Sequence, residues 1–233
     1  MDLQNREQFL NKLAKRMGKS KFQTIPEPMP QLVNDYPMTR LTDRNQMQLC
    51  DEFIDFAKVM MADVVVTKES DAAQTIITIC DKYGGGSVVI NNDQRLVELG
   101  IMSAVQARYD SYVWSSENAE FNIERSEKAN IGIVYGEYGL AESGGVVLFS
   151  DKQFGRAVSL LPEKSIVILR KSKILPRVAQ LAKILDEKAR QGERMPSCVN
   201  IISGPSATAD IELIKVVGVH GPVSKIYLVI DDL

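Results

Sequence analysis

The sequence predicts an α/β protein with a mostly parallel central sheet and flanking helices. From residue 62 onward, short apolar runs alternate with segments of helical periodicity, and this alternation favours parallel strands joined by helices. The runs at 64–66, 87–90 and 165–169 are almost entirely apolar, as in strands that are buried on both faces. A chain of 233 residues is long enough to bury such a core.

The N-terminal segment predicts an appendage to this domain. Residues 3–18 read as an amphipathic helix, because Phe9, Leu13 and Met17 recur at helical spacing. Prolines at 26, 28, 30 and 37 then interrupt regular structure, so residues 19–38 read as an extended linker. We therefore expect a helical arm and linker over 1–38 and the α/β domain over 40–233. The arm could pack on its own domain or on a neighbouring subunit, which leaves a homo-oligomer open.

Helices and strands are expected in alternation within the α/β domain. The predicted helices cover residues 42–61, 70–82, 93–99, 117–128 and 174–190. The predicted strands cover residues 64–66, 87–90, 131–135, 146–149, 165–169, 199–202, 211–217 and 226–230. Pro176 suits the first turn of the last helix, and the glycines at 84–86 end the helix that begins near residue 70.

Composition excludes several classes of function. The net charge is −2, with 45% apolar and 25% charged residues, so nothing favours binding to nucleic acid or to an anionic membrane. No apolar run approaches the roughly 20 residues of a membrane helix, and the mixed-charge N-terminus lacks the apolar core of a signal peptide. These features predict a cytoplasmic protein.

The cysteines are dispersed and do not form a metal-binding pattern. Cys50, Cys80 and Cys198 lie far apart, and no CxxC pair is present. The usual four ligands of a zinc or iron–sulfur site are therefore not supplied by cysteine. We expect free thiols in a reducing compartment and no cofactor or metal in this chain.

A glycine-rich segment around Glu142 and Ser143 is one candidate for chemistry. It reads Gly-Leu-Ala-Glu-Ser-Gly-Gly over 139–145, and its glycines permit tight turns and left-handed backbone. Such a loop can present amide N–H groups to an anion or a carbonyl oxygen. The alternative is an ordinary hairpin or a turn that enters a strand.

The segment 202–222 carries the other candidates. If residues 208–212 are extended, Thr208, Asp210 and Glu212 share one face. Two carboxylates so close would raise the pKa of one of them by mutual repulsion, as general acid–base sites often do; the alternative is a solvated strand face. His220, the only histidine, lies in Gly-Val-His-Gly-Pro and could donate to a carboxylate or transfer a proton, or could simply be a turn residue.

Four motifs together resemble the LUD-domain proteins, and within them the lactate utilization protein C (LutC) family. They are G-L-A-E-S-G at 139–144, R-x₄-L-P at 156–162, I-S-G-P-S-A-T-A-D-I-E at 202–212 and G-V-H-G-P at 218–222. The resemblance implies a fold similar to the NagB/RpiA/CoA-transferase group. Ala207 stands where family members often have a basic residue, which removes a potential anion contact.

The resemblance also implies a function. It indicates a role in oxidising L-lactate to pyruvate alongside two iron–sulfur partners, LutA and LutB, which would carry the redox cofactors. Two alternatives stay open. One is a stand-alone enzyme acting on a small anionic substrate such as a sugar phosphate or a CoA ester, and the other is a non-catalytic assembly subunit.

We expect the candidate residues to surround one cleft at the strand ends, where loops and free backbone N–H groups gather. Glu142 and Asp210 are the expected acid–base pair, and His220 is a donor to one of them. Arg156 is the expected partner of a substrate carboxylate, unless it neutralises a buried Asp210 or Glu212. The remaining expected substrate contacts are Ser143, Ser206, Thr208 and Glu212.

Overall fold

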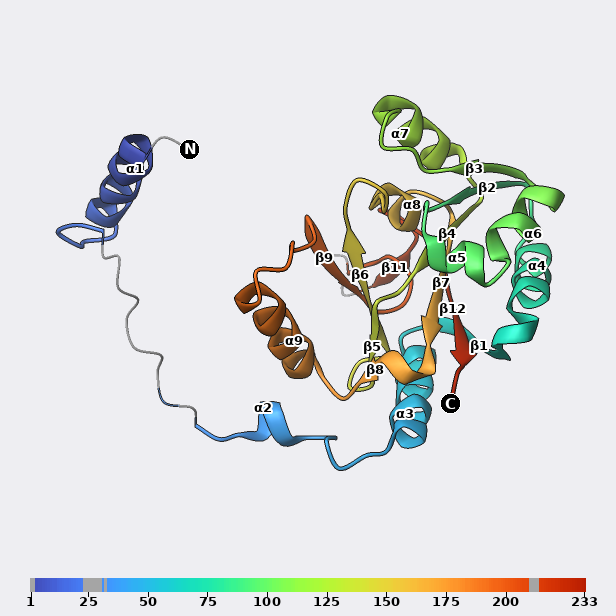
Figure 1. Ribbon diagram of the computed structural model, residues 1–233, viewed down its shortest axis with the longest axis horizontal. Helices are drawn as coiled ribbons and strands as arrows, with labels where there is room; N and C mark the ends of the chain where they lie inside the picture. Colours follow the sequence, from blue (N-terminus) through green and yellow to red (C-terminus); the bar gives the residue numbers. More distant parts are fainter. Residues whose placement is uncertain (1–2, 23–30, 32, 210–213) are drawn as a thin grey trace. The chain divides into compact units, whose positions relative to one another are not determined.

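The computed structural model describes residues 3–22, 31, 33–209 and 214–233, and it divides into two compact units, Met1–Asp35 and Tyr36–Leu233. In the first unit, α1 (Leu3–Arg16) is the predicted amphipathic helix (Figure 1). The chain folds back after it, because the Phe22 amide donates to Asn11 Oδ1 at 2.9 Å and the Arg6 guanidinium lies 5.8 Å from the Phe22 ring centre.

The second unit contains a fully parallel six-stranded sheet, which confirms the predicted fold class. The strand order is β1-β12-β7-β4-β2-β3. The strands are β1 (Ala62–Lys68), β2 (Ser87–Ile90), β3 (Asp110–Val113), β4 (Ile131–Tyr135), β7 (Lys164–Arg170) and β12 (Ser224–Asp231). The central strands are almost wholly buried because helices cover one face of the sheet, and helices together with a second sheet cover the other.

One face of this sheet packs against three helices: α4 (Ala72–Lys82), α5 (Gln94–Glu98) and α6 (Ile101–Arg108). Isoleucines on alternate positions of β4, β7 and β12 meet Ile76 of α4 and Leu96 of α5 in one cluster. Each such side chain is fully buried, and each contributes about 1.5–3 kcal/mol. Figure 1 shows α4 and α6 lying together beside the sheet.

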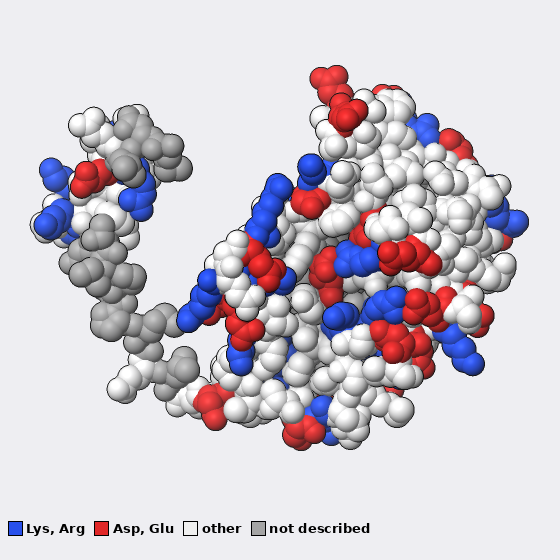
Figure 2. Space-filling model, viewed as in Figure 1, with Lys and Arg blue, Asp and Glu red and all other residues white. Residues whose placement is uncertain are grey.

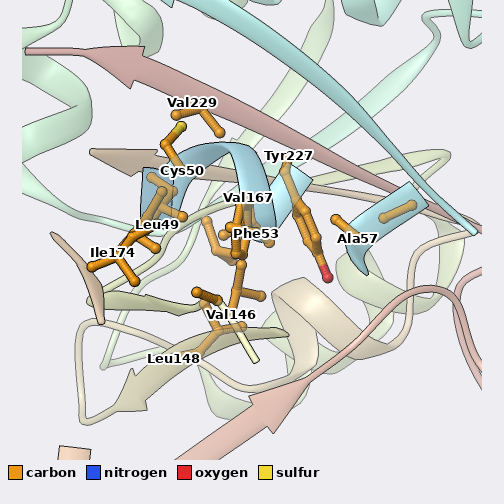
Figure 3. Packing of buried hydrophobic residues seen from close by; sticks show 14 of the residues in the cluster. Leu49, Cys50, Phe53, Ala57, Val146, Leu148, Val167, Ile174, Tyr227 and Val229 are labelled. Atoms are coloured by element: carbon orange, nitrogen blue, oxygen red, sulfur yellow. The ribbon is translucent and has the colours of Figure 1, made fainter. Parts of the chain in front are cut away.

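The opposite face packs against α3 (Gln46–Val59), α8 (Ala157–Leu160) and a second sheet, with α7 (Ala119–Lys128) beside α8. Asn45 begins α3 through a capping box with Gln48. Figure 3 shows Phe53 of α3 against Tyr227 of β12, and their ring centres are 5.6 Å apart. This contact fixes α3 on the sheet and leaves the Tyr227 hydroxyl at the margin of the cluster.

The second sheet has four strands in the order β8-β5-β6-β9. Its strands are β5 (Tyr138–Leu140), β6 (Gly145–Ser150), β8 (Ile174–Leu175) and β9 (Cys198–Ile202). Leu140, Val147 and Leu181 form a small core between this sheet and α9 (Val178–Arg190). A separate two-stranded pair consists of β10 (Ala207–Ala209) and β11 (Lys215–Val217). The remaining elements are the short helix α2 (Tyr36–Thr39) and 3-10 turns at Glu69–Asp71 and Lys171–Lys173.

Some predicted boundaries were wrong. The predicted helix 174–190 begins only at Val178, because Ile174 and Leu175 pair with β5 as β8, so Pro176 precedes the helix instead of lying in its first turn. Helix α6 and strand β3 were not predicted. β3 lies at the edge of the sheet and opens with polar Asp110 and Ser111, so it lacks the apolar run that marks the central strands. Of the predicted strand 211–217, residues 211–213 lie outside the described residues.

Across the part of the chain that the structure describes, none of the helices combines the length and the apolar character needed to cross a membrane.

Candidate functional site

A pocket of about 300 Å³ opens at the amino end of the parallel sheet, where β7 and β12 begin. Two short turns, at 203–206 and 220–222, meet α8, the end of β9 and the start of β12 there. We call it the amino-end pocket, and its lining residues are Ser159, Leu160, Ile201, Ile202, Ser203, Gly204, Pro205, Ser206, His220, Gly221, Pro222 and Lys225.

Two of the residues predicted from sequence, Ser206 and His220, line this pocket together. The Ser206 amide donates to the Pro222 carbonyl at 3.0 Å, and the Gly218 amide donates to the Ser206 carbonyl at 2.9 Å. These backbone bonds tie the turn at 204–206 to the turn at 218–222. The two motifs are therefore held side by side by the backbone, which leaves the serine hydroxyl and the imidazole available to a ligand.

The turn at 204–206 requires a glycine at position 204. Its φ is +69°, and a Cβ at this position would lie 1.9 Å from the Met60 carbonyl oxygen. The Gly204 amide donates to Tyr227 Oη at 3.1 Å, and that hydroxyl in turn donates to the Ile202 carbonyl at 3.3 Å. The wall of the pocket thus rests directly on the end of α3 and on β12.

Lys225 is the pocket residue that sequence reasoning missed. It is only 2% exposed, and its Nζ donates to Ser165 Oγ at 2.8 Å. Burial lowers the pKa of Lys225 from 10.5 to about 7. The sequence does contain a signal for this residue. Lys225 lies on the same face of β12 as Tyr227 and Val229, and because side chains alternate along a strand, the lysine points toward the core.

Glu142 occupies a hairpin turn between β5 and β6, which is the plainer of the two predicted readings. One carboxylate oxygen accepts from Arg177 Nε at 2.6 Å, and the other accepts from the Val178 amide at 2.8 Å. Val178 is the first residue of α9, so a carboxylate here satisfies a free N–H group and complements the helix dipole. The contacts of Glu142 therefore anchor α9 to the second sheet.

Of the remaining candidates that the structure describes, Ser143, Arg156 and Thr208 are not among the residues that line the amino-end pocket. A Cβ built on Gly145 would lie 3.0 Å from Ser143 Oγ and 2.7 Å from Ser203 Oγ, so Ser143 lies behind the pocket wall. Arg156 is exposed, and its carbonyl accepts from the Ser159 amide at 3.1 Å. Thr208 is exposed on β10, while Asp210 and Glu212 lie outside the described residues.

A second polar cluster lies at the opposite, carboxyl edge of the sheet. We call it the Arg95 cluster. Arg95 donates to Asp93 Oδ1 from Nε at 2.9 Å and to Asp93 Oδ2 from Nη2 at 2.7 Å, and it donates to both oxygens of Glu137 at 3.0 and 2.6 Å. Its guanidinium also lies 4.1 Å from the ring centre of Tyr135 and 5.9 Å from that of Phe154.

Burial lowers the pKa of Arg95, but its hydrogen bonds and the charges of Asp93 and Glu137 outweigh burial and raise the pKa overall. The guanidinium is thus permanently charged and held in a fixed orientation. Figure 2 shows acidic and basic side chains interleaved across the middle of this view, with no extended field of one sign. The arrangement can orient a polar ligand without attracting polyanions.

The Arg95 cluster lies where the direction of the chain changes in the sheet. After β2 the chain continues to β3 on one side, and after β4 the next strand added to this sheet is β7 on the other side. Ligands of open α/β sheets bind outside carboxyl ends at such a switch point. Asn91, which is 6% exposed, follows β2 here, and its Oδ1 has no hydrogen-bond partner within the described part of the chain. The sequence signal was the polar run Asn91-Asn92-Asp93 directly after a buried strand.

A search for metal sites over residues 3–22, 31, 33–209 and 214–233 finds no group of three histidine, cysteine, aspartate or glutamate residues that could hold an ion.

These features define the class of the protein: an α/β domain with a parallel six-stranded sheet, a smaller mixed sheet on one face, and polar sites at both ends of the strands. The chain belongs to the LUD-domain family, whose model matches residues 50–230. This confirms the resemblance that the four motifs predicted.

Several relatives are similar to the chain over almost its whole length. The uncharacterized protein YkgG of Escherichia coli K12 is 54% identical over 99% of this chain and 100% of its own. Lactate utilization protein C of Halalkalibacterium halodurans is 39% identical over 99% of each chain, and that of Bacillus subtilis is 35% identical over 99% and 98%. A DUF162 family protein from Deinococcus radiodurans shares the fold, with a TM-score of 0.58, 16% identity and coverage of 80% of this chain and 99% of its own.

Proposed function

We propose that this chain is the LutC-like component of a cytoplasmic L-lactate utilization system, which oxidises L-lactate to pyruvate together with iron–sulfur partner proteins similar to LutA and LutB. One observation carries this proposal: relatives named lactate utilization protein C match the chain from end to end at 35–39% identity. Similarity over the whole length includes the α/β domain together with the N-terminal segment, so it covers the loops that build the pocket as well as the core.

The environment of two cysteines supports placing the iron–sulfur clusters in the partners. Cys50 and Cys80 are buried in the two apolar clusters on opposite faces of the sheet. Burial raises the pKa of both thiols, that of Cys80 to about 12. Cluster ligation needs thiolates. These two side chains therefore serve as apolar packing groups and are poor ligands.

We place the small carboxylate substrate in the amino-end pocket. Ser206 and His220 contribute a hydroxyl and an imidazole to its wall, and both can donate hydrogen bonds to a carboxylate. Arg156 stays the predicted partner of the substrate carboxylate. The acid–base roles of Glu142 and Asp210 also stay predictions, and the contacts of Glu142 with Arg177 and Val178 favour an anchoring role for that residue.

Growth on lactate tests the proposed function directly. A strain that carries a deletion of this gene should fail to grow with L-lactate as sole carbon source and should grow normally on pyruvate. Wild-type protein supplied from a plasmid should restore growth, and affinity purification of that protein should recover iron–sulfur proteins. Normal growth of the deletion strain on lactate would instead favour the stand-alone enzyme.

Two point variants test the site separately from the fold. His220→Ala and Ser206→Ala should restore growth on lactate less well than wild type at equal levels of folded protein. Ser103→Ala is the matched control, because Ser103 is exposed on α6 and does not line the pocket. Full growth with both pocket variants would leave the system assignment intact and remove the pocket from it.

A further inference from the structure

Lys225 is an unusual residue for the interior of a parallel sheet. It is the second residue of β12, which lies between β1 and β7, and its whole side chain is removed from solvent. A charged lysine is almost never fully buried unless it is paired. Its side chain donates to Ser165 Oγ, and no carboxylate of the described residues lies within 4.0 Å of its Nζ.

The groups around Lys225 offer little alternative charge. Ser165 faces it from β7, and Ala62 is its register partner on β1. Helix α8 presents Ser159 and Leu160 to the pocket and carries no titratable side chain. The titratable neighbours are His220 on the preceding loop and Tyr227 on the same strand, where burial raises the pKa of the tyrosine to about 12.

The amino-end pocket gives this amine a place to meet a ligand. Lys225 lines it together with three serines and His220, so the pocket combines an amine with hydroxyl and imidazole groups that can donate hydrogen bonds. The volume of about 300 Å³ is at the lower end of the range for small-molecule sites. A single cation matches a monovalent anion better than a phosphate dianion, which would keep an uncompensated charge.

We propose that Lys225 is the anionic-ligand anchor of the amino-end pocket, and that its ammonium group binds the carboxylate of a small organic acid. This inference rests on the proposed function for the choice of acids, L-lactate and pyruvate. In the free pocket Lys225 is therefore only partly protonated near neutral pH, because burial disfavours the charge. The bound carboxylate restores the charge by pairing with it, so binding takes up a proton.

Binding of L-lactate and pyruvate to the purified full chain tests the proposal, with isothermal titration calorimetry as the measurement. Lys225→Met keeps the length of the side chain and removes the charge, and it should weaken binding at least tenfold. Lys215→Met is the matched control: Lys215 is exposed on β11, does not line the pocket, and should bind the acids like wild type. Circular dichroism should show that both variants are folded.

The pH dependence of the binding affinity provides a second test, because a lysine with a purely structural role would not produce it. Affinity should be constant below about pH 7 and should fall about tenfold for each pH unit above it, as the free amine loses its proton. Lys225→Met should lose this dependence. Equal affinity of wild type and Lys225→Met, absence of any binding to wild type, or binding of inorganic phosphate alone would each overturn the proposal.

Growth experiments separate this inference from the proposed function. If the gene is required for growth on lactate but the purified chain binds neither acid, the anchor fails and the function stands. If Lys225→Met loses binding and also fails to restore growth on lactate, the anchor belongs to the substrate site. If the gene proves dispensable on lactate while binding depends on Lys225, the function fails and the anchor stands.

Discussion

Arg95 and Glu137 join the ends of two neighbouring parallel strands. Arg95 follows β2 and Glu137 follows β4, and the two guanidinium Nη atoms donate to the two carboxylate oxygens at 3.0 and 2.6 Å. This bidentate pair closes over the switch point of the sheet, and Asp93 holds the same guanidinium from the β2 side. The crevice where α/β proteins commonly bind ligands is thus fixed by a three-residue ion network.

Replacing Arg95 with methionine should destabilise the protein by about 3 kcal/mol. The change leaves Asp93 and Glu137 facing each other without their cation, and the side chain of Asp93 is only 5% exposed. Urea unfolding followed by circular dichroism measures the effect. Arg95→Lys should recover part of the loss, because lysine keeps the charge without the fork. Arg108→Met is the control, since its pair with Asp81 is exposed, and it should change stability little. Equal effects of the two methionine variants would contradict the buried network.

Replacing Glu142 with alanine should cost about 2 kcal/mol and loosen the start of α9. The variant loses the ion pair with Arg177 and the acceptor for the Val178 amide. Hydrogen exchange should accelerate in the first turn of α9. Asp186→Ala, which removes an exposed ion pair on the same helix, should leave that turn protected. Unchanged exchange in Glu142→Ala together with loss of growth on lactate would instead support the catalytic role predicted from the sequence.

Replacing Gly204 with alanine should be far more disruptive than replacing Gly192. Both glycines have positive φ, +69° and +73°, so each substitution carries a backbone cost of about 1 kcal/mol. Only at position 204 would the new Cβ also collide with the Met60 carbonyl oxygen, whereas nothing lies within 4 Å at position 192. Thermal unfolding should show a large loss for Gly204→Ala and a small one for Gly192→Ala. Similar losses would mean that the turn can shift away from α3.

Lys225 should make the protein more stable as the pH rises from about 7 toward 10.5. Its pKa is lower in the folded chain than in the unfolded one, so the unfolded state binds more protons within this window. Below pH 7 both states are protonated, and the folded state carries the full cost of the buried charge.

Lys225→Met removes this cost, so it should be several kcal/mol more stable than wild type at pH 7 and nearly equal to it near pH 10. Urea unfolding of both proteins at several pH values gives the difference between their free energies of unfolding. The contributions of other titrating groups cancel in this difference. A difference that does not change with pH would show that Lys225 stays charged or neutral throughout.

The sequence by itself determined the central strands and most of the helices. The apolar runs at 87–90, 131–135 and 165–169 form β2, β4 and β7, and the alternation with helices gave the parallel α/β class. The resemblance carried by the four motifs was confirmed by the family match. The strands and helices follow from local periodicity and from the need to bury apolar side chains, which the residues themselves specify.

Only the tertiary structure decided which polar side chains meet. Ser206 and His220 share a pocket because backbone bonds join their turns, whereas Glu142 pairs with a residue 35 positions away at the start of α9. The partners of Lys225 and Arg95 depend on the order of the strands. Strand β7 brings Ser165 to Lys225, and β4 brings Glu137 to Arg95. Contacts between distant segments depend on how the strands are ordered, and no local pattern encodes that order.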